Sequence, residues 1–259
     1  METPHVSNRL VRLFTRYSRG YVRRHFHGVR LLKSHQLVAD FRRLPAVVYL
    51  NHSSWWDPLI CLLLAAEYFP NRTSFAPIDA AALQKYRFLE KLGFFGIDSK
   101  STRGAATFLR TAGNILDSPE RMLWVTPQGR FTDVRTRPAS FRGGLAALAG
   151  RVGPTVFLPM AIEYTFWEER LPEVLVAFGS PLFSQQHQNS CGVSDWNAAL
   201  EGTIQDAQDA LADASQRRDP NEWEVLSRGA SGTTAVYDLW RQARAAIRRE
   251  SFNAEHSAL

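Results

Sequence analysis

The stretch PAVVYLNHSSWWDPLICLLLAAEYF, residues 45–69, places an apolar run, a polar turn and a second apolar run in direct succession. The first run, residues 45–50, is short and apolar throughout, which is typical of a buried strand. The second run, residues 58–69, is long enough for a helix, and the pair Asp57–Pro58 before it favours a helix start. The stretch therefore predicts a strand followed at once by a helix, with NHSSWWD in the turn.

The same alternation continues after this unit. Further strands are predicted over residues 73–77, 94–98, 121–126, 155–164 and 173–179, and further helices over 105–116, over 144–150, and through Leu83 and Leu89 to a stop near Gly93. Such alternation through short loops indicates an α/β fold, with a mostly parallel mixed sheet flanked by helices on both faces. Sites in these sheets form at the carboxyl ends of strands, where NHSSWWD and the PQGR of residues 127–130 would lie.

Three segments differ in composition along the chain. Residues 1–35 form a basic head with an amphipathic helix, residues 36–184 hold the alternating core, and residues 185–259 are polar and helix-prone. The last segment has a Gly/Ser break at residues 228–232 and a further predicted helix through Val236, Leu239, Trp240 and Ala243. No clear linker separates these segments, so we expect the C-terminal extension to pack on the same domain.

The composition argues against several classes of protein. The two cysteines, Cys61 and Cys191, are too few for a disulfide framework and lie in no metal-ligand spacing, which favours a reducing compartment and predicts no bound metal. Cys61 lies inside an apolar run and is interpreted as a core residue, not a nucleophile. No run reaches the roughly 18 apolar residues of a membrane-spanning helix, and arginines interrupt the N-terminal apolar residues, unlike in a signal peptide. We expect a cytoplasmic protein.

The net charge of +6 is concentrated near the N-terminus. Residues 9–43 hold one acid, Asp40, against the basic residues Arg9, Arg12, Arg16, Arg19, Arg23, Arg24, Arg30, Lys33, Arg42 and Arg43. Apolar residues recur there at helical spacing, namely Leu10, Leu13, Phe14, Tyr17 and Tyr21. Such a helix fits an anionic membrane surface, where each arginine contributes on the order of 1 kcal/mol. Packing on its own domain is the alternative, and nucleic acid is not the expected partner because no nucleic-acid motif accompanies the charge.

His52 and Asp57 lie five positions apart across the strand-to-helix turn, so both side chains can face one cleft. A neutral imidazole held by a carboxylate can take a proton from a hydroxyl, because the carboxylate fixes the tautomer and stabilises the imidazolium. The helix that begins near Asp57 would also point backbone N–H groups toward developing negative charge. The alternative is structural: Asp57 caps the helix and His52 satisfies a loop carbonyl.

Four blocks, in this order and spacing, resemble the lysophospholipid and glycerolipid acyltransferase family, which includes the 1-acylglycerol-3-phosphate acyltransferases. NHSSWWD (51–57) resembles the family's NHxxxxD motif, and GFFGIDS (93–99) its GxxFIxR block. TPQGRFTD (126–133) resembles its FPEGTRS block, and VFLPMAIEY (156–164) the strand that bears its proline motif. The resemblance covers residues 17–184 and implies the glycerolipid-acyltransferase α/β fold.

By this resemblance His52 is the base that deprotonates an acceptor hydroxyl, and Asp57 orients it. The hydroxyl oxygen then attacks an acyl-CoA or acyl-ACP thioester directly, with no cofactor and no covalent acyl-enzyme, in agreement with the lack of a GxSxG elbow. Asn51 either shapes the turn or donates to the thioester oxygen, Gly129 lets backbone approach a substrate, and Pro159 shapes the acyl or acceptor channel. The residues expected to contact substrate are Asn51, Ser53, Gln128, Gly129, Arg130, Arg135 and Pro159.

Two blocks depart from the family's pattern. The second ends in Ser99 instead of arginine, and the third has Gln128 for glutamate, with Arg130 and Phe131 for threonine and arginine. In members that act on phosphorylated acceptors, the replaced residues are associated with holding the acceptor. The acceptor is then either a lysophospholipid or acylglycerol phosphate, or an uncharged lipid such as a glycosylated isoprenoid, whose hydroxyl Gln128 could bind. Replacement charge for a phosphate could come from Arg130, Arg135, Arg137 and Arg142.

In either case we expect a peripheral enzyme of lipid metabolism on the inner face of the cell membrane. Trp55 and Trp56 would wall an acyl tunnel, sit at the membrane interface or pack in the core. A membrane-binding protein that kept the fold and lost turnover is the alternative from another class. The intact His52 and Asp57 argue against that alternative.

Overall fold

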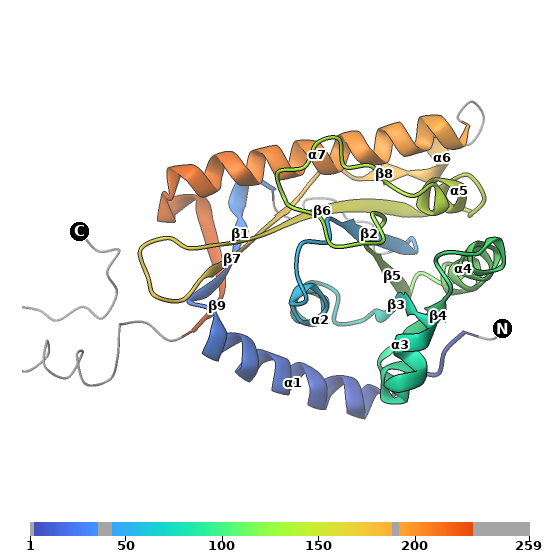
Figure 1. Ribbon diagram of the computed structural model, residues 1–259, viewed down its shortest axis with the longest axis horizontal. Coiled ribbons are helices and arrows are strands. Elements are labelled where there is room, and N and C mark those ends of the chain that lie inside the picture. The colour runs from blue at the N-terminus through green and yellow to red at the C-terminus, as the bar shows by residue number, and fades with distance from the viewer. Residues whose placement is uncertain (1–2, 36–42, 188–191, 230–259) are drawn as a thin grey trace, which may run out of the picture.

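A single sheet passes through the centre of the molecule in the computed structural model, which describes residues 3–35, 43–187 and 192–229 (Figure 1). Within these residues it has nine strands, in the order β4-β3-β5-β2-β6-β7-β1-β9, with β8 paired to β6. The strands are β1 (Gly28–Leu32), β2 (Ala46–Leu50), β3 (Thr73–Asp79), β4 (Phe94–Ile97), β5 (Arg121–Val125), β6 (Val156–Thr165), β7 (Glu173–Phe178), β8 (Leu182–Phe183) and β9 (Trp223–Arg228). The helices are α1 (Asn8–His25), α2 (Asp57–Tyr68), α3 (Ala80–Lys85), α4 (Thr102–Ile115), α5 (Gly144–Ala149), α6 (Ser184–His187) and α7 (Val193–Arg217), with 3-10 helices η1 (Lys33–His35), η2 (Arg87–Leu92) and η3 (Pro220–Glu222).

The sheet is mixed and mostly parallel, which confirms the predicted α/β class. β2 runs parallel to both β5 and β6, and β3 and β4 continue the parallel part beyond β5. β7 is antiparallel to β6, β1 is parallel to β7, and β9 is antiparallel to β1. Because β2 and β5 are parallel neighbours, the segments after them leave the sheet at the same edge, and the segment after β2 lies next to the second half of β6.

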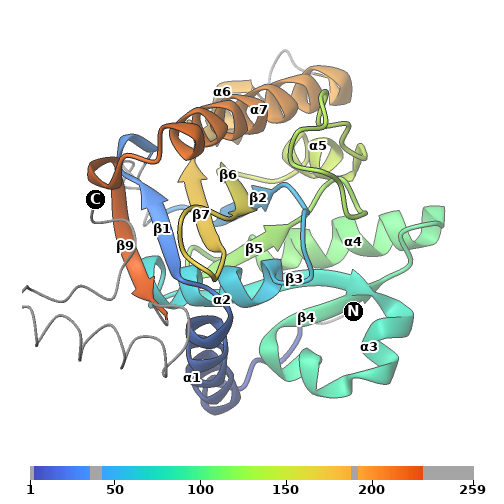
Figure 2. The ribbon, with the colours of Figure 1, turned by 60° about the vertical axis from the view of Figure 1, so that its left-hand side comes forward.

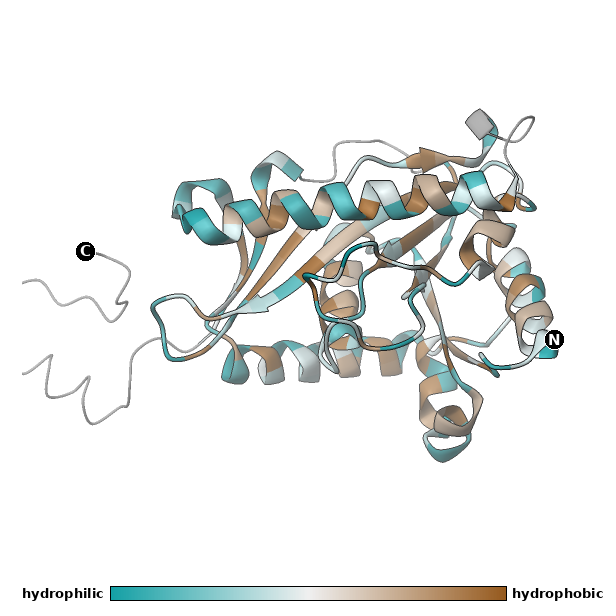
Figure 3. Ribbon diagram, turned by 45° about the horizontal axis from the view of Figure 1, so that its top comes forward, coloured by the Kyte–Doolittle hydropathy of each residue, from teal (hydrophilic) through white to brown (hydrophobic). Residues whose placement is uncertain are grey.

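Helices cover both faces of this sheet (Figures 1 and 2). Every residue of β2 is buried, and its side chains alternate between the faces. Val48 and Leu50 pack in one cluster with α1 and α2, whereas Val47 and Tyr49 pack in another with α4, α5 and α7. Figure 3 shows the resulting pattern, with apolar colour concentrated on the strands and alternating polar and apolar residues along α7. The burial of β2 on both faces fixes the turn that follows it.

The predicted helix through Leu83 and Leu89 is wrong as one element. α3 ends at Lys85, and Tyr86, with φ −123° and ψ 62°, interrupts the helical backbone before η2. Gly93 then closes η2 with a φ of 97°, and a Cβ at this position would lie 2.2 Å from the carbonyl oxygen of Ser74. The chain therefore turns tightly against β3 before it enters β4.

Three strands, β1, β8 and β9, were not predicted. Residues 1–35, expected to form a helical head, hold both α1 and β1, and β1 lies inside the sheet between β7 and β9. The C-terminal segment supplies α7, which packs on β6 and β7, and the edge strand β9. Arg30 in the middle of β1 interrupts the apolar run that would have marked it as a strand. The predicted helix through Val236, Leu239, Trp240 and Ala243 lies outside the described residues, as do Asp40, Arg42 and Cys191.

The N-terminal helix α1 lies along α2, with Ser18 and Val22 buried. Ser7 caps it by accepting a hydrogen bond from the Leu10 amide. Leu13 and Tyr17 stay outside this contact and are 65% and 57% exposed. The helix thus packs on its own domain along one side and leaves an apolar shoulder open. Among the described residues, no helix has the length and apolarity to cross a membrane.

Candidate active site

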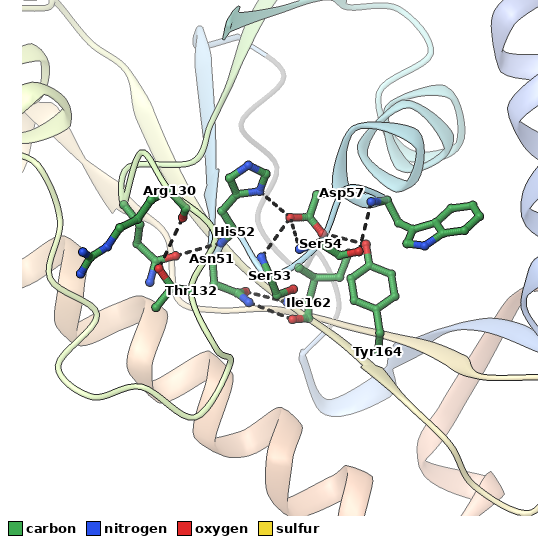
Figure 4. Close-up of polar contacts among 11 residues, drawn as sticks. Asn51, His52, Ser53, Ser54, Asp57, Arg130, Thr132, Ile162 and Tyr164 are labelled. Atoms are coloured by element: carbon green, nitrogen blue, oxygen red, sulfur yellow. Dashed lines mark hydrogen bonds and ion pairs between the residues drawn. The ribbon is translucent and has the colours of Figure 1, made fainter. Parts of the chain in front are cut away.

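The turn between β2 and α2 brings His52 and Asp57 into contact. Nδ1 of His52 lies 2.6 Å from Oδ2 of Asp57, and Figure 4 shows the two side chains facing each other. The carboxylate is 2% exposed and the imidazole 20%. An ionised Asp57 accepts the Nδ1 proton, which leaves Nε2 of the neutral ring with a free lone pair. The geometry is that of a general base held by a carboxylate.

Asp57 accepts three further hydrogen bonds, which together fix its orientation (Figure 4). The backbone amides of Ser53 and Ser54 both donate to Oδ2 at 3.1 Å. The hydroxyl of Tyr164 on β6 donates to Oδ1 at 2.7 Å. Burial, and then the negative charge of Asp57, raise the pKa of the Tyr164 hydroxyl well above its usual value. Tyr164 therefore remains a donor throughout the physiological range of pH.

The amides near the start of α2 are engaged inside the turn. Those of Ser53 and Ser54 bind Asp57, and those of Leu59 and Ile60 donate to the carbonyl of Trp56. The anion that this turn stabilises is thus the Asp57 carboxylate. The expectation that N–H groups of the helix start would face developing negative charge on a substrate is not met by these amides.

Asn51 anchors the turn to β6. Its Nδ2 donates to the carbonyl of Ile162 at 2.9 Å, and its Oδ1 accepts the Ile162 amide at 2.9 Å (Figure 4). The residue is 2% exposed. Of the two roles predicted for Asn51, shaping the turn is the one that these contacts fit.

The loop after β5 braces the other side of the turn. Oε1 of Gln128 accepts the His52 amide at 2.9 Å, and its Nε2 donates to the carbonyl of Ala139 at 3.2 Å. The amide of Thr132 donates to the carbonyl of His52 at 2.8 Å. Gln128 is 5% exposed, so both ends of its side chain serve the protein interior. These contacts fit a brace for His52 and leave the predicted hydroxyl-binding role of Gln128 without support.

The other residues predicted to contact substrate are placed as follows. Gly129 has a φ of 62°, and a Cβ there would lie 2.9 Å from Nε of Arg142, so that side chain covers it. Pro159 lies on β6 and faces α7: a Cβ built at Gly179 would lie 2.9 Å from its Cγ and 3.1 Å from Cβ of Ala207. These contacts are with the protein interior, and they give no support to its predicted role in a substrate channel. The Ser53 hydroxyl is buried and has no hydrogen-bond partner among the described residues.

The arginines that could replace a phosphate-binding pattern are mostly engaged elsewhere. Arg135 pairs with Asp133 at 2.7 Å and Arg137 with Asp209 at 2.5 Å. Arg142 donates to the carbonyl of Ser99 at 3.0 Å. The side chain of Arg130 points away from His52 in Figure 4. No cluster of guanidinium groups therefore surrounds the imidazole among the residues that the structure describes.

Aromatic rings flank the catalytic turn. Phe131 lies against the imidazole of His52, with ring centroids 4.3 Å apart, and is 60% exposed. Trp56 is partly buried and stacks on Tyr21 of α1, with centroids 5.4 Å apart, so it joins the turn to α1. Trp55 is 66% exposed. Of the roles predicted for the two tryptophans, core packing fits Trp56 and a surface position fits Trp55.

Tyr164 and Phe131 were not assigned a role from the sequence. Tyr164 lies far along the chain from Asp57, and the register of β6 against β2 brings the two together. The departure from arginine at position 131 was visible, but its contact with His52 depends on how the loop after β5 folds back. Of these two residues, only Phe131 could have been singled out from the sequence, through its departure from the family's pattern.

One comparison with known proteins found a match. A family model described as Acyltransferase matches residues 24–163, more than half of the chain. The search of curated proteins found no match. The matched segment begins inside α1 and ends one residue before Tyr164, so it includes His52, Asp57 and the loop that carries Gln128 and Phe131.

Proposed function

The chain belongs to the acyltransferase family, and from this premise we propose that it moves a fatty acyl group from an acyl-CoA or acyl-ACP thioester to a hydroxyl of a membrane lipid. The observation that carries the proposal is the contact between Nδ1 of His52 and Asp57. It leaves Nε2 as the free nitrogen of a side chain that is 20% exposed. A base in this position contributes about 10² to 10⁴ in rate.

In the proposed reaction Nε2 of His52 takes the proton of the acceptor hydroxyl as its oxygen attacks the thioester carbonyl. The tetrahedral intermediate then expels the thiolate, which receives that proton from the imidazolium. A C–O bond forms, a C–S bond breaks, and Asp57 stays ionised to stabilise the imidazolium. Cys61 is a poor competing nucleophile, because burial and then the charge of Asp57 raise the pKa of its thiol well above the usual value.

The proposal is tested with purified protein, a labelled acyl-CoA or acyl-ACP, and a total lipid extract. Label should move into the lipid fraction as an ester, and free thiol should appear in equal amount. Failure of the wild-type protein to acylate any lipid with either donor would overturn the proposal and favour a membrane-binding protein without turnover.

We expect Tyr164→Phe to lower kcat by about tenfold, because Asp57 loses a donor that fixes its orientation and hydrogen bonds to charged groups contribute about 1.5–3 kcal/mol. With one donor fewer, the carboxylate should stabilise the imidazolium more strongly, so the acidic limb of the kcat profile should move to higher pH. Tyr68→Phe is the matched control, because the Tyr68 hydroxyl is buried and makes no hydrogen bond among the described residues. If Tyr164→Phe and Tyr68→Phe lose stability equally and the acidic limb of the kcat profile does not move in Tyr164→Phe, Tyr164 has a structural role only.

We also propose that α1 holds the enzyme on the anionic inner face of the cell membrane. Arg9, Arg12, Arg16 and Arg23 are exposed along α1, beside the apolar shoulder of Leu13 and Tyr17. Phe14 links this shoulder to the exposed Phe88 of η2, with ring centroids 6.3 Å apart. Basic and aromatic residues at one surface fit the headgroup layer, where guanidinium groups meet lipid phosphates and rings enter the interface.

Replacing Leu13 and Tyr17 together by aspartate should lower binding to vesicles of phosphatidylglycerol and phosphatidylcholine by at least about tenfold, because two apolar side chains are lost and two negative charges are added at the surface. Sedimentation with the vesicles measures this. Val193→Asp is the control, since Val193 is 52% exposed but lies at the start of α7, on the opposite face of the sheet. Equal binding by all three proteins would refute the assigned surface.

A further inference from the structure

The aromatic side chain of Phe131 is placed to contact an acceptor at His52. Its ring lies 4.3 Å from the imidazole of His52, centroid to centroid, and 60% of the residue is exposed. The exposed ring therefore stands beside the proposed base. An aromatic face attracts C–H groups and apolar surface, and it offers no hydrogen-bond donor to a phosphate.

The charges around this ring do not compensate for its lack of donors. Phosphate recognition needs well-placed guanidinium groups, preferably in bidentate geometry. Arg135 donates from Nε and Nη2 to the two carboxylate oxygens of Asp133, at 2.9 and 2.7 Å. The side-chain hydrogen bonds from Arg135 hold the pKa of Asp133 well below its usual range. Arg130 points away from His52 (Figure 4).

Arg137 and Arg142 are committed in the same way. Arg137 donates to Asp209 on α7 and to the carbonyls of Val134 and Thr136. Arg142 lies over Gly129 and donates to the carbonyl of Ser99. A phosphate monoester beside His52 would therefore lie against an aromatic ring, with no guanidinium group of the described residues placed to bind it. The water that its charge loses there would not be replaced by hydrogen bonds from the protein.

We propose that Phe131 determines acceptor specificity, and that it selects an uncharged lipid whose hydroxyl lies on a sugar ring. One face of a hexose presents mainly C–H groups, which pack on an aromatic ring while the hydroxyls at the edge remain free to reach Nε2 of His52. Such an acceptor needs no guanidinium cluster. This proposal rests on the proposed acyl transfer and gives it a substrate class.

The experiment compares two acceptors with one acyl-CoA donor. Monoglucosyl diacylglycerol carries hydroxyls on an unphosphorylated sugar, and lysophosphatidic acid carries one beside a phosphate monoester. For the wild type, kcat/KM should be at least about tenfold higher with the glucosyl lipid. Phe131→Ala should lose about tenfold on the glucosyl lipid, chiefly through KM, which is the size of effect expected for one aromatic contact. Phe131→Arg should raise relative use of lysophosphatidic acid.

Phe166→Ala is the matched control, because Phe166 is 63% exposed but has no ring contact with His52. Its ratio of the two kcat/KM values should equal that of the wild type. Transfer that favours lysophosphatidic acid, or a ratio unchanged in Phe131→Ala, would overturn the specificity while leaving acyl transfer in place. A change in preferred acyl-chain length without a change in acceptor ratio would assign Phe131 to the donor instead and overturn it too. Absence of transfer to every lipid would mark failure of the proposed function itself.

Discussion

A His52→Ala variant is expected to transfer acyl groups about 10²- to 10⁴-fold more slowly than the wild type. The substitution removes the imidazole whose Nδ1 is held by Asp57 at 2.6 Å, so no base remains beside the acceptor hydroxyl. Because the base acts on the proton in the transition state, the loss should fall on kcat more than on KM. Single-turnover measurement of ester formation isolates this step from product release.

The folded state should survive this change. The backbone of residue 52 keeps its bonds to Gln128 and Thr132, so the turn stays braced when the side chain is lost. His5→Ala is the matched control, since His5 is exposed and lies before α1. A His52→Ala protein that unfolds at the wild-type temperature and still transfers acyl groups at the wild-type rate would rule out the imidazole as the base.

Local patterns predicted the centre of the fold and the pair at its site. β2 and α2 follow one another as two apolar runs; every residue of β2 is buried, and α2 is buried along part of its surface. The contact between His52 and Asp57 forms inside one turn, so their spacing together with the family resemblance could indicate it. Both features depend on residues that are close in the chain.

Features that depend on distant residues were not predicted. β1 is a short strand with Arg30 at its middle, and it is recognisable through its pairing with β7 and β9. Tyr164 reaches Asp57 because the Asn51 side chain pairs with the backbone of Ile162 and so fixes β6 beside the turn. Periodicity carries no information about such a register, which is set by the packing of the whole sheet.

A second such feature is a buried ionic cluster of His27, Arg30 and Glu173, between β1 and β7. Nδ1 of His27 lies 2.5 Å from one carboxylate oxygen of Glu173, and Nε of Arg30 donates to the other at 3.0 Å. The side chains are 7%, 13% and 1% exposed. Gly28 allows this approach, because a Cβ there would lie 2.8 Å from Glu173. The cluster joins the end of α1 to the sheet and so positions the helix that stacks on Trp56.

The pKa values in the cluster set the pH range in which it stabilises the fold. Burial opposes ionisation of Glu173, but hydrogen bonds from His27 and Arg30 outweigh it and lower the pKa of that carboxyl. Its contribution is thus present above about pH 4.3, the unfolded value, and lost as the pH falls through the folded pKa. The hydrogen bond to Glu173 raises the pKa of His27. That contribution is present below about pH 6.5 and lost as the pH rises through the folded pKa.

Glu173→Ala should lower the free energy of unfolding by about 3–5 kcal/mol, because it leaves the Arg30 cation buried without its partner. The loss should be largest between about pH 4.5 and 6.5, where both contributions of the cluster are present. Urea unfolding at several pH values measures it. Glu222→Ala is the control: Glu222 pairs with Arg217 at 3.0 Å near the surface, and such a pair contributes less than about 1 kcal/mol. Equal losses in the two variants would show that the buried Glu173 cluster stabilises the fold no more than a surface ion pair does.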